Sequence, residues 1–166
     1  MGGLGGLLGG LKIVRKQALS ARGGETPAQR RRRRSVLFLC VANSARSQMA
    51  EGFARHLAPR GVRVTSAGSR PGGLNPLAVE VMAEVGIDIS AHAAKSMDTI
   101  SLDEIGVVIF LCADEICPVF PARVERIHWP LPDPAAEKGS RDKRLRAFRR
   151  VRTELHQRIG ALMELV

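Results

Sequence analysis

"VLFLCVANSARSQMAE", residues 36–51, begins as a wholly apolar run, passes through a polar segment and continues as a helix-like pattern. Residues 36–40 have the composition of a strand that is buried on both faces. In residues 46–58 apolar side chains recur every four positions, which predicts an amphipathic helix with Met49, Phe53 and Leu57 on one face. We therefore predict a strand, a turn and a helix, with Cys40 at the carboxyl end of the strand.

Strands and helices alternate through the rest of the chain. Strand-like runs cover residues 62–68, 107–112 and 123–129, and helical patterns cover residues 75–87 and 141–165. Helix 75–87 has typical start and stop signals, because it begins with Asn-Pro and has a glycine near its end. The alternation predicts an α/β fold in residues 35–166: a single doubly wound domain with a four-stranded parallel sheet flanked by helices. Ligands of such sheets bind at the carboxyl ends of the strands, where the runs ending at Cys40 and Cys112 both stop.

The net charge of +10 is concentrated before this domain. Residues 1–34 carry nine Lys/Arg and one acidic residue, a net charge of +8, whereas residues 35–166 carry 17 Lys/Arg and 15 Asp/Glu, a net charge of +2. The Gly/Leu-rich start and the five arginines at 30–34 predict that residues 1–34 form a flexible arm. We expect no specific nucleic-acid partner for the domain; nonspecific attraction of the arginines to nucleic acid or anionic lipid stays an alternative.

The cellular compartment is predicted from the cysteines and the N-terminal pattern. No stretch approaches the roughly 18 to 20 apolar residues of a membrane span. The apolar part precedes the basic part, the reverse of a secretory signal, and the bulky Phe38 and Leu39 argue against a lipoprotein site at Cys40. Three cysteines without such a signal indicate a reducing compartment, so we predict a cytoplasmic protein, and we expect a monomer. An organelle-targeting peptide and a start codon assigned too early both remain alternatives for the arm.

The turn after Cys40 has the composition of an oxyanion-binding loop. A strand-to-helix turn directs backbone N–H groups and a helix dipole to one point, and here the loop residues are Val41, Ala42, Asn43, Ser44, Ala45 and Arg46. The same field lowers the pKa of the Cys40 thiol and makes it a nucleophile. Arg46 offers a planar fork for a tetrahedral oxyanion, Ser47 can donate to the thiolate, and Asn43 tolerates left-handed backbone. The alternative is a buried strand cysteine beside an exposed helix arginine; the combined pattern favours catalysis.

The segment LCVANSARSQMAE resembles the phosphate-binding loop of the low-molecular-weight protein tyrosine phosphatases and, more closely, of the thioredoxin-coupled arsenate reductases of the same superfamily. SAG, GLNPLAVEVMAEVGIDIS, LCADEICP, HWPLPDPA and FRRVRTEL continue the resemblance over residues 35–166, and the arm has no counterpart. The resemblance implies the phosphatase-like fold, reduction of arsenate to arsenite, and thioredoxin or a similar thiol as the reductant. It implies no organic cofactor, and we expect no metal.

The resemblance also assigns a redox role to two further cysteines. Cys112 would attack the arsenic adduct of Cys40, and Cys117 would resolve the resulting disulfide. The interval between Cys112 and Cys117 is shorter by about two residues than in the best-known relatives. Lys95 stands where some relatives have an acid that helps to hold a structural potassium ion, so we do not expect that ion. Ala45 stands where relatives often have cysteine, which this chemistry does not use.

Other functions remain open from the sequence. If Cys112 is only a buried strand cysteine, the protein is a phosphatase acting on phosphotyrosine or another phosphomonoester, which needs one thiol, an arginine and an acid. Cys112, Cys117 and His128 could bind zinc, but a fourth ligand is not evident. A non-enzymatic protein that binds oxyanions or nucleic acid is the third alternative.

Both enzyme functions need a proton donor, and HWPLPDPA supplies one. Asp133 lies between two prolines after the fourth predicted strand, and it matches the general acid of both related families. Burial beside a bound anion would favour its protonated form. A turn-forming aspartate is the alternative role. We expect His128 and Trp129 to be packing residues.

Overall fold

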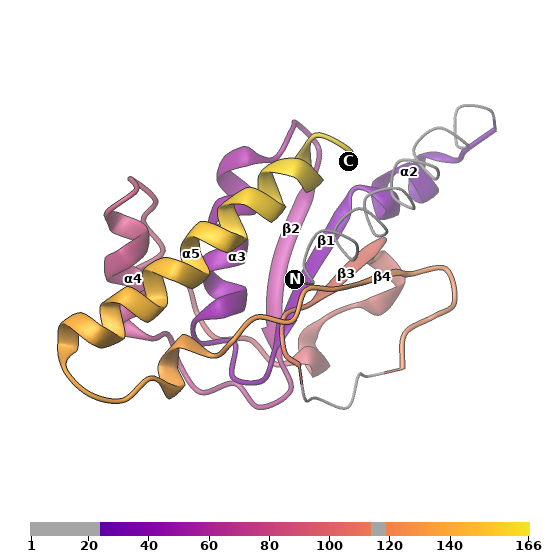
Figure 1. Ribbon diagram of the computed structural model, residues 1–166. Helices are drawn as coiled ribbons and strands as arrows, with labels where there is room; N and C mark the ends of the chain where they lie inside the picture. The colour runs from indigo at the N-terminus through magenta and orange to yellow at the C-terminus, as the bar shows by residue number, and fades with distance from the viewer. Residues whose placement is uncertain (1–23, 114–118) are drawn as a thin grey trace, which may run out of the picture.

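The computed structural model describes residues 24–113 and 119–166 and is built around a parallel sheet of four strands (Figure 1). Their order is β2-β1-β3-β4, where the strands are β1 (Ser35–Cys40), β2 (Arg63–Gly68), β3 (Val107–Phe110) and β4 (Glu125–His128). All neighbouring pairs are parallel. The predicted α/β fold is confirmed, including the strand that ends at Cys40.

Three helices cover one face of the sheet, α3 (Arg46–Leu57), α4 (Pro76–Ala83) and α5 (Arg141–Met163) (Figure 1). The Asn75 side chain accepts a hydrogen bond from the backbone N–H of Leu77 at 2.9 Å, so it caps α4 as its position before Pro76 predicts. Met49 and Phe53 are buried in the core formed by α3, α4, α5 and one side of β1. The periodicity of helix 46–58 therefore predicted the positions of Met49 and Phe53 correctly, whereas Leu57 is only partly buried.

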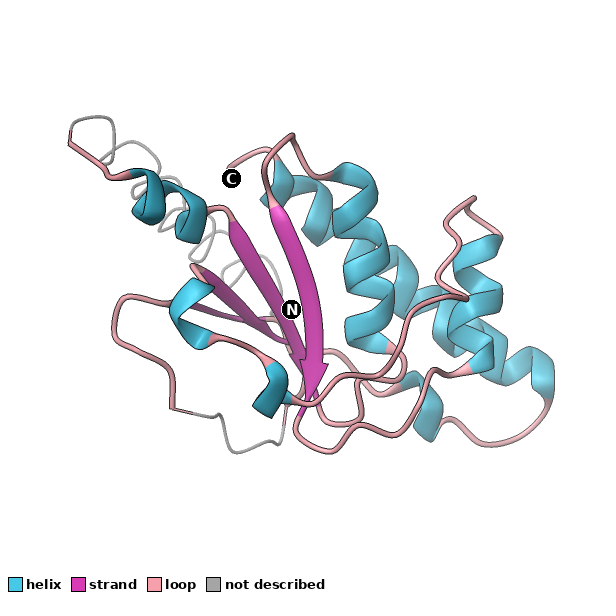
Figure 2. Cartoon of the chain, turned by 180° about the vertical axis from the view of Figure 1, so that it is seen from behind, coloured by secondary structure: helices cyan, strands magenta, loops and turns pink. Residues whose placement is uncertain are grey.

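The opposite face of the sheet is covered without α-helices (Figure 2). Two short 3₁₀ turns, η1 (Met97–Thr99) and η2 (Leu102–Glu104), lie on this side. They pack around the alternate side chains of β1 and β3, which form a smaller cluster with Phe120 and Val124. Since β1 is buried on both faces, its wholly apolar sequence has a structural reason.

The carboxyl ends of the strands bring distant loops to one edge of the sheet. Cys40 lies in register with Gly68, and Leu39 with Phe110. The third strand ends at Phe110, two residues before the predicted end at Cys112. Beyond this point the N–H of Leu111 still donates to the carbonyl of Leu39 in β1 (2.9 Å), whereas its carbonyl accepts from the backbone N–H of Leu131 in the loop after β4 (3.0 Å). Cys112 therefore lies in a loop at the edge where Cys40 ends its strand.

The predicted flexible arm differs from the structure at its carboxyl end. Residues Pro27–Arg33 form a short helix, α2, and residues 1–23 lie outside the described part of the chain. Thr26 and Gln29 make a reciprocal capping box, with backbone-to-side-chain bonds of 2.8 and 3.2 Å, and Pro27 occupies the first turn. Arginines in the last turn also suit the helix dipole. Within the described ranges, no helix is both long enough and apolar enough to cross a membrane.

Candidate active site

The loop between Cys40 and α3 forms a ring with its carbonyl groups turned outward. Each carbonyl from residue 41 to residue 45 accepts a hydrogen bond of 2.9 to 3.0 Å from outside the ring, and the donors are the backbone N–H groups of Arg70, Gly72, Asn75 and Met49 and the side chain of Gln48. A peptide C=O points away from the N–H of the next residue. The N–H groups of residues 42–46 can therefore face a common anion.

Asn43 is the internal brace of this loop. Its backbone is left-handed (φ 47°) and its side chain is fully buried. The backbone N–H of Lys95 donates to Asn43 Oδ1 at 2.7 Å, which fixes the orientation of the amide because a backbone N–H can only donate. Asn43 Nδ2 consequently donates to two hydroxyls, those of Ser47 (2.8 Å) and Ser66 (2.9 Å).

Gly68 is a site residue that the sequence analysis did not identify. A Cβ atom on Gly68 would lie 2.4 Å from the carbonyl oxygen of Val41 and 2.8 Å from the backbone nitrogen of Asn43. Both neighbours are backbone atoms of the anion loop, so a larger residue would displace the loop itself. The available signal was the SAG segment at the end of β2, because β2 is the neighbour of β1 and its last residue pairs with Cys40.

A buried polar layer under the loop was also missed. Gln48 Nε2 donates to the carbonyls of Asn43 and Ala93 at 3.0 Å, and Gln48 Oε1 lies 3.0 Å from His92 Nδ1. Burial lowers the pKa of His92, so the neutral ring that donates to Gln48 is favoured. The signal in the sequence was a polar residue, Gln48, on the buried side of an otherwise amphipathic helix.

Glu51 completes this layer with a buried negative charge. Its side chain is 2% exposed, accepts a hydrogen bond from Ser66, and forms ion pairs with Arg55 (2.5 Å) and Lys95 (3.2 Å). A buried carboxylate is tolerated only when it is paired in this way. The Lys95 ammonium therefore serves to neutralise Glu51, while the backbone N–H of Lys95 holds the anion loop through Asn43.

Cys40 has the environment of a reactive thiolate. The Sγ atom is buried and lies 2.8 Å from Ser47 Oγ. Since Asn43 donates to Ser47, the hydroxyl hydrogen of Ser47 is free to point to the sulfur. The pKa of Cys40 is lowered from 9.0 to about 6, chiefly by a hydrogen bond from the Cys112 thiol, against the opposing effect of burial; Ser47 and the charge of Arg46 lower it further. Cys112 is thus within hydrogen-bonding reach of the nucleophile.

The lowered pKa predicts how Cys40 reacts with an alkylating reagent. The thiolate fraction rises as pH increases through the pKa, so alkylation by iodoacetamide should be half-maximal near pH 6 rather than near the ordinary value of 9.0. Mass spectrometry of the peptide that contains Cys40 separates its modification from that of the other thiols. Replacing Ser47 by alanine should move the midpoint to higher pH, because one donor to the thiolate is lost. A midpoint above about pH 8 in the wild type would contradict the thiolate assignment.

Arg46 is held at the edge of the loop by the segment after β4. Its Nη1 donates to the carbonyl of Leu131 at 2.9 Å, and its Nη2 lies 3.9 Å from Asp133 Oδ2. The Arg46 side chain is only 11% exposed, whereas that of Asp133 is 46% exposed. The expected burial of Asp133 is therefore not found, because its loop lies at the rim of the site.

The two carboxylate oxygens of Asp133 have different partners. Oδ1 accepts from the backbone N–H of Ala135 at 3.1 Å and caps the turn η3 (Pro134–Ala136), which is the turn-forming role considered from the sequence. Oδ2 is directed to Arg46. A proton on Oδ2 could therefore reach an anion held by Arg46 without loss of the cap.

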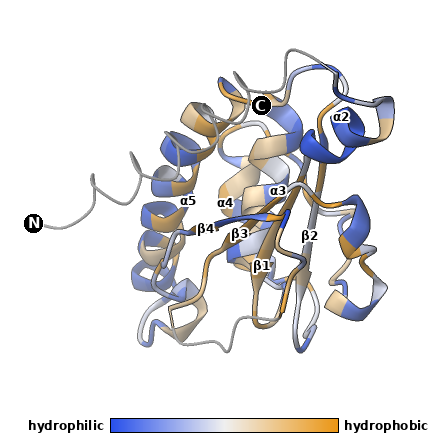
Figure 3. Ribbon diagram, turned by 90° about the vertical axis from the view of Figure 1, so that its right-hand side faces the viewer, coloured by the Kyte–Doolittle hydropathy of each residue, from blue (hydrophilic) through white to orange (hydrophobic). Residues whose placement is uncertain are grey.

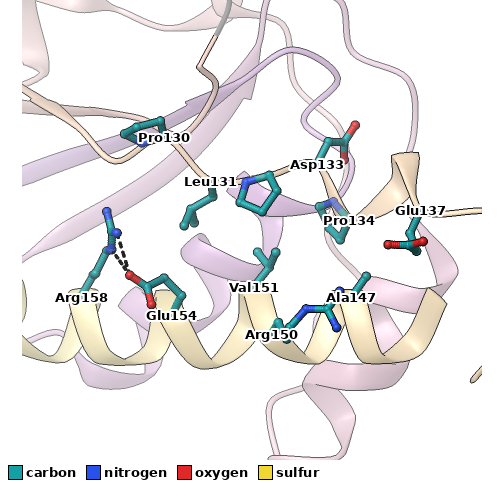
Figure 4. A pocket seen from close by; sticks show the side chains of 11 residues that line it. Pro130, Leu131, Asp133, Pro134, Glu137, Ala147, Arg150, Val151, Glu154 and Arg158 are labelled. Carbon is teal, nitrogen blue, oxygen red and sulfur yellow. Dashed lines mark hydrogen bonds and ion pairs between the residues drawn. The ribbon is translucent and has the colours of Figure 1, made fainter. Parts of the chain in front are cut away.

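The loop that carries Asp133 packs against α5 across a groove of about 390 Å³ (Figure 4). Leu131 and Val151 line it from the two sides, and Asp133 points away from α5. The groove lies behind the loop and contributes no further candidate to the chemistry at Cys40. The packing fixes the position of Leu131, because its side chain is buried while its carbonyl accepts the hydrogen bond from Arg46.

The remaining sequence candidates are placed as follows. Cys117 lies outside the described residues, so the relay and the zinc alternative, which both need it, stay predictions. Among the residues that the structure describes, no group of three or more His, Cys, Asp or Glu could hold a metal. Trp129 is buried, which agrees with a packing role. His128 is exposed, and its ring stacks on Phe110 with ring centres 4.8 Å apart.

Comparison with known proteins shows one family over the whole domain. The family model of low molecular weight phosphotyrosine protein phosphatases matches residues 35–166. An arsenate reductase of Shouchella clausii is 44% identical over 131 residues, which is 78% of this chain and 94% of the relative.

Solved structures give the same result. An arsenate reductase in its phosphate-binding state is 34% identical, covers 80% of this chain and 98% of its own, and superposes with a TM-score of 0.68. A thioredoxin-dependent arsenate reductase of Corynebacterium glutamicum is 26% identical, with a TM-score of 0.60 over 95% of this chain and 68% of that protein.

Proposed function

The chain belongs to the low molecular weight phosphotyrosine protein phosphatase family, and on that premise we propose that it is an arsenate reductase that uses Cys40 as nucleophile and Cys112 as the second thiol. The observation that carries the proposal is the Cys112 thiol, which lies within hydrogen-bonding reach of Cys40 and is the largest cause of its lowered pKa. Phosphoester hydrolysis needs one sulfur at this place, whereas two-electron reduction needs two.

In the first step the anion loop binds arsenate. The N–H groups of residues 42–46 and the guanidinium of Arg46 bind its oxygens. The Cys40 thiolate attacks arsenic and an oxygen leaves. Asp133 donates the proton that converts the departing hydroxide into water, and the product is a sulfur–arsenic(V) adduct.

In the second step Cys112 attacks the sulfur of Cys40. A sulfur–sulfur bond forms and the sulfur–arsenic bond breaks, and both electrons of that bond remain on arsenic. Arsenic(V) becomes arsenic(III) and leaves as arsenite, while two thiols become one disulfide. The proximity of Cys112 to Cys40 supports this step, because thiol–disulfide chemistry requires contact between the reacting sulfurs.

The disulfide must then be reduced for another turnover. We propose that Cys117 attacks Cys112, releases the Cys40 thiolate and leaves a Cys112–Cys117 disulfide for thioredoxin or a similar thiol protein. The thioredoxin-dependent relative of Corynebacterium glutamicum supports this choice of reductant.

A phosphatase is the second candidate, and the anion loop favours it as strongly as the first. A thiolate, an arginine and an acid at one oxyanion site are sufficient for hydrolysis of a phosphomonoester.

A coupled assay distinguishes the two functions. It supplies arsenate, thioredoxin, thioredoxin reductase and NADPH, and a chromogenic phosphoester is tested in parallel. NADPH oxidation that requires arsenate supports the reductase; phosphoester cleavage without arsenate-driven NADPH oxidation would leave only the phosphatase. Cys40→Ser should lose both activities, whereas a non-enzymatic oxyanion-binding protein would be indifferent to it.

A further inference from the structure

A basic surface lies at the end of the sheet opposite to the candidate active site. It consists of α2 with the arginine after it and the turn before β2, and we call it the α2 basic surface: Arg30, Arg31, Arg33, Arg34 and Arg60. In Figure 3 α2 is strongly hydrophilic and lies beside the amino ends of the strands. The strands run from this surface toward Cys40, so the two features occupy opposite edges.

The basic surface is joined to the domain by close backbone contacts. A Cβ on Gly106 would lie 2.4 Å from the carbonyl oxygen of Arg32, so the glycine permits α2 to approach the start of β3. The backbone N–H of Arg63 donates to the carbonyl of Arg34 at 2.7 Å, and the Arg34 guanidinium donates to the carbonyl of Arg60 at 3.2 Å. These contacts hold the arginines in a defined position on the domain.

The positive charge of α2 is only partly compensated within the described residues. Glu25 pairs with Arg33 (3.3 Å) and lies 3.9 Å from Arg30, whose side chain is 66% exposed. Asp103 and Glu104 of η2 line a hollow together with Arg31, and Glu104 also pairs with Arg63 at 2.8 Å. Residues 24–34 contain five arginines and one acid, and α2 buries none of its side chains. A seven-residue helix with adjacent like charges and no buried face is intrinsically weak. An anionic partner would remove the repulsion.

We propose that the α2 basic surface docks on an anionic lipid bilayer. Residues 1–11 consist only of Met, Gly and Leu, and residues 12–23 add four basic residues and no acid. In the sequence this apolar segment precedes the basic cluster, and apolar and basic residues together are the two signals of peripheral membrane binding. Residues 1–34 contain no aromatic residue, so the stacking contacts of single-strand nucleic-acid binders are missing from this part of the sequence.

Docking through α2 has a functional consequence. The carboxyl ends of the strands would face away from the membrane, because α2 lies at their amino ends. Cys40 would therefore stay open to its anionic substrate and to a protein reductant. Binding to vesicles should leave the turnover number unchanged, which separates this proposal from the proposed chemistry at Cys40.

The test is co-sedimentation of the full chain with vesicles of phosphatidylcholine, with and without phosphatidylglycerol. We expect binding only to the anionic vesicles, and less of it when NaCl is raised from about 0.05 M to about 0.5 M. Arg30→Gln with Arg31→Gln should weaken partitioning about 25-fold, since each basic residue near an anionic membrane contributes a factor of about five. The matched control is Arg144→Gln with Arg146→Gln, which removes the same charge from exposed positions of α5.

Each other outcome would overturn the proposal. Equal binding to neutral vesicles, or no binding to either kind, would exclude an anionic lipid surface. Equal loss in the two double variants would exclude a specific role for α2. Tighter binding to a DNA duplex than to anionic vesicles would assign the surface to nucleic acid. Leu7→Ser with Leu8→Ser provides a further check, because it should weaken vesicle binding and leave DNA binding unchanged. Far-UV circular dichroism verifies that every variant is folded.

Discussion

Cys112→Ser is expected to abolish arsenate turnover, by at least about 10³-fold in kcat, while phosphoester cleavage stays within about threefold of the wild type. Serine keeps a hydrogen-bond donor beside Cys40 but cannot form a disulfide. The arsenic adduct can still form. Without the Cys112 sulfur, however, no disulfide with Cys40 forms, and the two electrons of the sulfur–arsenic bond are not left on arsenic. The expected separation of the two activities follows from the position of the Cys112 thiol within hydrogen-bonding reach of Cys40.

The measurement is arsenate-dependent NADPH oxidation in the presence of thioredoxin and its reductase. Cys117→Ser is the matched control, because it should release about one arsenite per protein molecule in a single turnover and then stop. Cys112→Ser should release none. If Cys112→Ser supports continuous arsenate reduction, the second thiol is not the one assigned. If it loses phosphoester cleavage as well, the residue serves the structure of the site rather than the redox step.

Arg46→Lys has the second large effect, a fall of about 10³-fold in kcat/KM for both arsenate and a phosphoester. One guanidinium nitrogen donates to the carbonyl of Leu131 and another faces Asp133. The other N–H groups of the planar guanidinium can donate to the anion. A lysine ammonium keeps the charge but has a single nitrogen. It cannot hold the Leu131 loop and bind two oxyanion oxygens together.

Steady-state kinetics with both substrates, and competitive inhibition by phosphate, measure this loss. Because the positive charge remains, the alkylation midpoint of Cys40 should stay near pH 6, which shows that the thiolate is intact. Arg150→Lys is the matched control, since Arg150 is exposed and lies in the groove behind the Asp133 loop. A decrease smaller than about tenfold would mean that charge alone, and not the fork, binds the anion.

The predictions from sequence were most accurate where the physics is local. The apolar run 36–40 and the four-residue spacing in 46–58 gave the strand and the helix on either side of the anion loop. They failed where a local signal was overlooked or where a distant partner decided the outcome. The capping box at Thr26 begins a helix in the predicted arm. The third strand ends at Phe110, and the carbonyl of the next residue, Leu111, bonds to the distant Leu131.

The sequence by itself determined the strand, the loop and the helix around Cys40, because periodicity, capping and left-handed tolerance act between near neighbours. Only the tertiary structure decided what surrounds them. Asn43 is hydrogen-bonded to Lys95, 52 residues away, and Arg46 to Leu131, 85 residues away. Gly68 approaches the loop from the neighbouring strand, and the Cys112 thiol lies within hydrogen-bonding reach of the Cys40 sulfur. Such contacts depend on sheet order and on the path of each loop, which no single stretch of sequence specifies.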